Sequence, residues 1–305
     1  MMLRIAAVSL GAVLVLPQLA AAQSLSFSSK DSDKPITVTA KEGLEWRQTE
    51  KQFVARGDAK AVQDETEVTA DQLVAHYREK PGSTGEESGS EVYRVDAVGH
   101  VIVKSKNETA TGDAAVYDFD RKVLVMQGEQ VNLVTGDGNV TAHKTLQYWS
   151  DQNVAVAEGD AVAVDTTPGN AGRRIRADRL TAFFRDAGDK KGAAKGRDLI
   201  FLQGAGNVVL TTKTEIVRGD RADYNLDTGM ATVEGGVKMT RDKNQLNGGY
   251  AVVTVKGGVS RLYGSAAEAK GAPGAGAAPP ARVRALLAPN NKSTDNAPMP
   301  QGNTR

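Results

Sequence analysis

The sequence of 305 residues contains no cysteine, which excludes disulfide bonds and thiol chemistry. It contains only 3 histidines, and His76, His100 and His143 have no second histidine or cysteine at ligand spacing, so a metal site is unsupported. Aromatic residues make up only 5% of the chain. A chain of this length can bury a core, and this core must be built mainly from aliphatic side chains.

Neither sign of charge predominates, since the formal net charge is +1. This balance argues against a general nucleic-acid binder, which needs a clustered basic surface. Nucleophile-elbow, phosphate-loop and Rossmann signatures are absent. We therefore expect no catalytic residues, no cofactor and no nucleic-acid partner. One basic cluster, 173–176, is either a solvated loop beside strands or a contact for an anion such as lipid phosphate.

Long apolar runs are missing except at the N-terminus. There, Arg4 precedes an apolar run at 5–16, and Ala20-Ala21-Ala22 follow Pro17. This pattern is typical of a cleavable secretory signal peptide at 1–22, and the run is shorter than the roughly 20 residues of a membrane span. We expect cleavage near Ala22 and export to the periplasm. An uncleaved membrane anchor is the alternative.

Composition also separates the segments that flank the central region. Residues 23–34 are Ser-rich, and we expect them to be flexible. Residues 265–305 are first Ala/Gly/Pro-rich and then polar. Because such a composition buries too little apolar surface to order itself, we expect a disordered tail there.

The central region, 35–264, consists of repeated strand units. Residues 219–240 show one complete unit, in which alternating strands flank a tight turn at Asp227-Thr228-Gly229. Three glycines precede an aspartate by 14 positions: Gly57 and Asp71, Gly99 and Asp113, Gly206 and Asp220. Self-similar units predict serially wound strands around one continuous interior. We expect an elongated all-β fold with no helical domain, in which these aspartates have a structural role at turns or edges.

These units resemble the LptA/OstA family of periplasmic lipopolysaccharide-transport proteins. The resemblance rests on residues 35–40, 53–59, 68–73 with Tyr77, 112–117 and 123–128, and it recurs at 219–239. It implies a β-jelly roll with a V-shaped section and an apolar trough. It also implies lipopolysaccharide as partner, with the lipid A acyl chains in the trough. Inner-membrane LptC-like and outer-membrane LptD-like proteins would bind by edge-strand addition, and head-to-tail self-association is possible.

The resemblance also implies which side chains line a lipid-binding groove. They are Ile36, Val38, Leu73, Val101, Val103, Tyr117, Phe119, Val123 and Val125. For each of them the alternative is an ordinary closed core residue, and Glu108 is expected to point outward. The units after Gly159 exceed a usual single roll, so they either lengthen the groove or form a second roll joined near 165–175.

Three functions follow from this reading. The first is a lipid-carrying bridge that passes lipopolysaccharide from the inner-membrane complex to the outer-membrane translocon. The second is an inner-membrane-anchored, LptC-like partner in the same pathway. The third is a structural β-solenoid with a closed, filled interior and no lipid.

Overall fold

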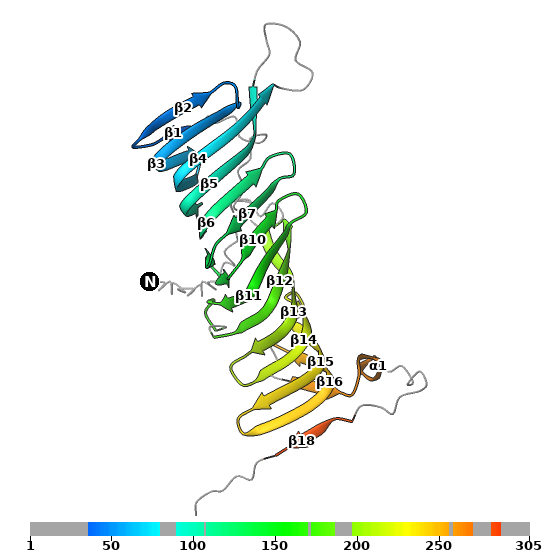
Figure 1. The fold of residues 1–305 in the computed structure, drawn as a ribbon. Helices are drawn as coiled ribbons and strands as arrows, with labels where there is room; N and C mark the ends of the chain where they lie inside the picture. Colours follow the sequence, from blue (N-terminus) through cyan, green and yellow to red (C-terminus); the bar gives the residue numbers. More distant parts are fainter. Residues whose placement is uncertain are drawn as a thin grey trace, which may run out of the picture.

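The computed structural model describes residues 36–79, 90–106, 108–169, 172–186, 197–255, 259–270 and 282–287. These residues form an elongated, twisted stack of antiparallel strands, with one short helix among them near the C-terminal end of the stack (Figure 1). The predicted all-β, jelly-roll-like architecture of serial strand units is confirmed. The expected signal peptide at 1–22 and the flexible segment at 23–34 lie outside the described residues.

The described residues form 18 strands. In chain order they are β1 (Thr37–Thr39), β2 (Gly43–Arg47), β3 (Gln52–Gln63), β4 (Thr66–Glu79), β5 (Ser90–Lys104), β6 (Thr109–Asp118), β7 (Val123–Gln127), β8 (Val131–Val134), β9 (Gly138–Ala142), β10 (Thr145–Trp149), β11 (Val154–Asp165), β12 (Arg174–Asp186), β13 (Arg197–Thr211), β14 (Ile216–Asn225), β15 (Met230–Arg241), β16 (Asn244–Thr254), β17 (Val259–Tyr263) and β18 (Arg284–Leu286). The helix is α1 (Ala266–Ala269). No helix among the described residues is long and apolar enough to cross a membrane.

The long strands each belong to two sheets. In β3, for example, residues 52–56 and 59–63 pair with β4 as two separate segments, with a register shift between Arg56 and Ala59. Such shifts recur between successive long strands, and they define a fold line along the stack. On one side of this line, the first sheet includes β2, β7, β10 and β17 with half of each long strand. On the other side, the second sheet includes β1, β8, β9 and β18 with the remaining halves.

Glycines with positive φ make the bends in alternate long strands. Gly57, Gly99, Gly159, Gly206 and Gly235 have φ between 72° and 91°. This left-handed conformation costs glycine little, whereas an L side chain is strained there. The bends therefore explain why glycine recurs at these positions.

Aspartates on the intervening strands contact these bends. A Cβ atom added to Gly99 would lie 2.0 Å from Asp71 Oδ2, so glycine is also needed for the close approach of that carboxylate. Asp71 Oδ2 lies 2.9 Å from His100 Nδ1, and the Asn207 amide donates to Asp178 at 2.9 Å. These aspartates thus link neighbouring strands at the fold line, which is the kind of structural role expected of them.

One apolar core runs along the whole stack between the two sheets. It extends from Ala55 to Val253 as a single cluster of mostly Ala, Val and Leu side chains. β11 pairs with β12 on both sides of the fold line, through residues 154–158 and 161–164. Strand pairing therefore continues past the 165–175 region, where a join between two rolls was the alternative.

Two segments of the expected disordered tail are ordered, which corrects that prediction for them. The Ser265 side chain caps α1 by accepting from the Glu268 N–H, and the Glu268 carboxylate accepts from the Gly264 N–H at 2.9 Å. β18 pairs with the edge of β16. Helix capping orders α1, and pairing with the distant strand β16 orders β18. The amino-acid composition of a segment does not reveal either kind of contact. Residues 271–281 and 288–305 lie outside the described part.

Candidate functional site

The candidate site is the apolar interior between the two sheets. Val101 and Val103, on the second sheet, are only 1% and 2% exposed. Leu73 and Tyr117, on the first sheet, are also buried, and all four belong to the continuous core cluster. The chain's own side chains therefore fill the interior at these positions.

Three further predicted residues lie at less enclosed positions. Phe119 is partly buried against the core, with its ring edge-on to Tyr117 at 4.7 Å. Ile36 and Val38 are 38% and 39% exposed at the N-terminal end of the stack, and Val38 pairs opposite the core residue Ala61. These positions are the accessible part of the predicted lining.

Val123 and Val125 face away from the interior, so their predicted inward position is wrong. In β7 it is Leu124 and Met126 that belong to the core cluster, and successive strand residues point to opposite faces. The register of the β6–β7 hairpin pairs Tyr117 with Leu124. The prediction placed Val123 on the same inward face as Tyr117 and Phe119. The observed register is offset by one residue, so Leu124 takes that position and Val123 points to the other face.

A group of three aromatic residues, absent from the predicted lining, lies on β2, β3 and β4 at the N-terminal end of the first sheet. The Trp46 and Phe53 rings stack at 5.6 Å, the Phe53 and Tyr77 rings lie 4.9 Å apart, and Trp46 Nε1 donates to the Tyr77 hydroxyl at 2.7 Å. Beside it, Leu44 is 62% exposed and pairs opposite the core residue Ala55. We call these residues the aromatic end cluster. The alternation of Leu44 and Trp46 before Phe53 was the sequence signal for it.

Polar contacts connect the two sheets on the side opposite the fold line, which we call the open side. The Glu215 side chain is 3% exposed and lies 2.9 Å from Arg241 Nη2. It also accepts a hydrogen bond from Ser260, which belongs to β17 of the first sheet. Nearby, Arg173 Nη2 donates to the Val255 carbonyl at 3.2 Å. These contacts all lie in the C-terminal half of the stack.

Glu108 and the basic cluster at 173–176 do not both lie on the outward-facing surface. Glu108 is only 8% exposed, so its expected outward position is wrong. It follows the sharp β5–β6 connection, where strand alternation no longer predicts the face. The basic cluster at 173–176 is divided between two places, because Arg173 reaches the open side while Arg176 Nη2 contacts Asp160 at the fold line at 2.7 Å.

Burial raises the pKa of two groups near the open side. Burial raises the pKa of Tyr224, with Asp165 adding to the effect and Arg173 opposing it. Burial also raises the pKa of Asp137, and repulsion from Asp165 and Asp198 adds to it. The described residues contain no group of three His, Asp or Glu side chains placed to hold a metal ion.

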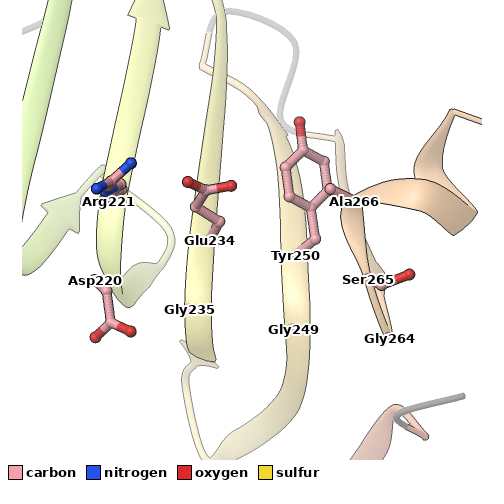
Figure 2. A pocket seen from close by; sticks show the side chains of 9 residues that line it. All are labelled: Asp220, Arg221, Glu234, Gly235, Gly249, Tyr250, Gly264, Ser265 and Ala266. Carbon is pink, nitrogen blue, oxygen red and sulfur yellow. The ribbon is translucent and has the colours of Figure 1, made fainter. Parts of the chain in front are cut away.

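Open depressions occur on the outer surface beside the fold line. One of them, of about 380 Å³, is lined by Arg221, Glu234 and Tyr250 on three neighbouring strands, and Figure 2 shows Tyr250 nearest the start of α1. Another, of about 460 Å³, is lined by charged residues that include Lys144 and Arg179. Because these residues alternate with the inward-facing ones, neither depression leads into the apolar interior.

Comparison with known proteins gives one family match. Residues 37–154 match the family described as LptA/(LptD N-terminal domain) LPS transport protein. None of the curated proteins matches the chain. Among solved structures, the chain is similar to LptH, the LptA homologous periplasmic component of the lipopolysaccharide transport device from Pseudomonas aeruginosa. That match is 15% identical, covers 56% of this chain and 96% of LptH, and has a TM-score of 0.21, which is too low to establish a shared fold.

Proposed function

We propose, on the premise that residues 37–154 match the LptA/LptD N-terminal domain family of lipopolysaccharide-transport proteins, that the chain is a periplasmic bridge that carries lipopolysaccharide between the two membranes. In this role the lipid A acyl chains lie between the two sheets while the sugars and phosphates remain in solvent. The observation that supports it best is the apolar core, which runs as one cluster along the whole stack.

Lipid binding requires the two sheets to separate at the open side, because the chain's own side chains fill the interior. Burial of apolar surface supplies the driving force, at about 0.8 kcal/mol per methylene. An acyl segment of about ten methylenes would therefore gain roughly 8 kcal/mol, which offsets the loss of contacts between the sheets. The aromatic end cluster and Val38 are the accessible apolar positions at which an acyl chain first meets the interior.

The continuous pairing of β11 with β12 favours one extended roll over 36–264 rather than two rolls. The inner-membrane LptC-like and outer-membrane LptD-like partners would bind by strand addition at its two ends, where β1 and β2 or β17 and β18 form the edges. An extended roll lets fewer copies span the periplasm. Export with cleavage near Ala22 would leave the mature chain free to form this bridge, whereas an uncleaved first segment would make it an anchored LptC-like partner.

The closed interior is the observation that favours the second candidate, a structural β-solenoid without lipid. Val101, Val103, Val208, Val217 and Val237 are each at most 2% exposed, as in the filled core of a purely structural module. The two candidates differ in whether lipopolysaccharide ever lies against inward-facing side chains in the cell.

Photocrosslinking in intact cells tests this difference. A photoreactive phenylalanine analogue replaces Phe119 or Val38, which are partly exposed positions that accept the added atoms, and a second set carries it at the buried Val103. Lys104 is the matched outward control, because it is exposed and adjacent to Val103. Adducts that contain lipopolysaccharide at Phe119 and Val38, and none at Lys104, are the expected result. Properly exported protein that gives no adduct, or equal adducts at Lys104, would overturn the carrier and favour the structural module.

Mass spectrometry of the purified chain measures the mature N-terminus. A chain that starts at Gln23 is the result expected for a free periplasmic protein. A chain that retains Met1 and sediments with membranes would instead identify the anchored, LptC-like alternative.

A further inference from the structure

The outer face of the second sheet carries unbalanced positive charge in the C-terminal half of the stack. From β12 to β18, two rows of outward-facing residues cross the paired strands, and these described positions include basic residues but no aspartate or glutamate. The basic residues, all of them exposed, are Arg174, Arg176, Arg218, Lys238 and Arg284. Their neighbours along the strands, such as Val217 and Val237, are buried in the core. The charged side chains therefore point away from the interior.

Two of these cations face each other directly. Arg218 on β14 pairs opposite Lys238 on β15, and like charges at directly opposed positions of a sheet are destabilising. Arg176 has a carboxylate partner, since its Nη2 lies 2.7 Å from Asp160 at the fold line. The ion pairs that the described residues form in this half include neither Arg218 nor Lys238. The sheet thus keeps an unfavourable pair of charges that an external anion would relieve.

Charge is balanced on the neighbouring surfaces of the stack. On the outer face of the first sheet, the same strand β12 carries Arg179, which lies 3.6 Å from Glu158. There β14 carries Arg221, which pairs directly opposite Glu234. In the N-terminal half of the second sheet, Lys60 Nζ lies 2.7 Å from the Glu67 carboxylate. The excess of positive charge is therefore confined to one face of one half, in a chain whose formal net charge is only +1.

Exposed apolar side chains lie at the C-terminal end of the same face. Leu286 is on the outward side of β18, opposite Gln245 and two residues from Arg284, and it is 67% exposed. Leu287 follows it and is 70% exposed. A soluble polyanion would bind the cations alone, whereas the interfacial region of a bilayer accepts cations and apolar side chains together. The combination favours an anionic lipid surface over a nucleic acid or a polyphosphate.

The size of the face also suits a surface of many headgroups. Neighbouring strands lie about 4.8 Å apart, so the row that begins at Arg176 on β12 and ends at Arg284 on β18 extends over roughly 24 Å. Charges distributed over this length meet several anions at once. A single phosphate or carboxylate group would reach only one part of the row.

We propose that Arg174, Arg176, Arg218, Lys238 and Arg284, which together we call the basic face, dock on a bilayer that carries anionic phospholipid headgroups. The cations lie against the lipid phosphates, and Leu286 enters the headgroup region at the end of the face. This inference goes beyond the proposed bridge, because it uses the outer surface of the second sheet and not the interior. In the docked state this half of the stack lies along the membrane, so docking is an alternative to the spanning arrangement.

Vesicle co-sedimentation with the purified, exported chain tests the docking. Vesicles made of equal parts phosphatidylcholine and phosphatidylglycerol are compared with vesicles of phosphatidylcholine alone. Each basic residue at an anionic surface strengthens binding about fivefold, so the double variant Arg218→Gln, Lys238→Gln should bind the anionic vesicles roughly 25-fold more weakly. Added salt should weaken the binding of the parent as well.

The matched control removes the same charge from the other sheet. Arg179→Gln with Arg221→Gln changes two exposed arginines on β12 and β14 of the first sheet, and it should bind the vesicles as the parent does. An equal loss in this control would show that binding follows net charge, and it would overturn the basic face. A parent chain that binds the anionic vesicles no better than the neutral ones would also overturn it.

A second comparison separates a bilayer from a soluble polyanion. Leu286→Ser removes the exposed apolar side chain, so it should weaken vesicle binding about fivefold and leave the binding of inorganic polyphosphate unchanged. Polyphosphate binding as strong as vesicle binding, together with no effect of Leu286→Ser on the vesicles, would identify a soluble polyanion as the ligand and overturn the bilayer.

Discussion

The two long margins of the stack are built differently. At the fold line, the same contact recurs along the length, with a glycine of positive φ beside an aspartate at Gly99, Gly206 and Gly235. On the open side, the contacts between the sheets that the described residues make join particular residues, such as Glu215 with Ser260 and Arg173 with Val255. The fold line is thus held by a glycine conformation that recurs along the stack, and the open side by contacts of individual side chains.

This difference assigns separate mechanical roles to the margins. A bend fixed by backbone conformation in every second long strand keeps the two sheets attached along the whole stack. Side-chain contacts between the sheets can break one at a time, each with a net contribution of only about 0.5 to 3 kcal/mol. Separation of the sheets should therefore begin at the open side, while the fold line acts as the hinge.

The largest expected effect comes from a change at the fold line. Gly235→Ala adds a Cβ atom 2.2 Å from Asp220 Oδ2 at a φ of 84°, so we expect urea unfolding to show a loss of about 2 to 4 kcal/mol. Gly169→Ala is the matched control, with a φ of 86° and no atom within 4 Å of the new Cβ, and it should cost about 1 kcal/mol. Asp220→Ala should partly rescue Gly235→Ala. Equal losses for the two glycines would show that the aspartate contact is unimportant.

A smaller effect is expected on the open side. Arg241→Ala leaves the buried Glu215 carboxylate with one fewer partner, so we expect a loss of about 1 to 3 kcal/mol. Hydrogen exchange should become faster in β17, which carries Ser260, before it changes in β3 and β4. Arg218→Ala, at an exposed position in β14, is the control. Exchange that rises equally along the stack would contradict the idea that the open side separates locally.

The smallest effect concerns protonation at the fold line. The hydrogen bond with Asp71 raises the pKa of His100, and its charge adds to the shift. Because the folded pKa lies above the ordinary value of about 6.5, this contribution to stability is present below that pH and is lost as pH rises through the folded pKa. NMR titration should show the raised pKa and its return toward the ordinary value in Asp71→Asn. An unchanged His100 titration in that variant would exclude the contact in solution.

Sequence reasoning predicts the parts of this fold that repeat. Alternation of apolar residues identified the strands, the family resemblance implied that Leu73, Val101 and Val103 point inward, and the recurring glycines and aspartates indicated structural corners. The division into two sheets was not predicted, because bends inside strands leave the alternation on each side intact. The face of Val123 depends on how many residues the preceding turn contains, and the order of β18 depends on an edge far away in the chain. Both features depend on tertiary contacts, which the local sequence pattern does not encode.

The two kinds of corner limit how a stack of this type can change length. Strands that cross from the first sheet to the second, such as β5 and β13, bend at a positive-φ glycine, whereas the returning strands β4, β6, β12 and β14 place an aspartate there. Loss or gain of a single long strand would set two corners of the same kind side by side. Such a protein should therefore be lengthened or shortened in steps of two strands, each step changing its reach by roughly 10 Å.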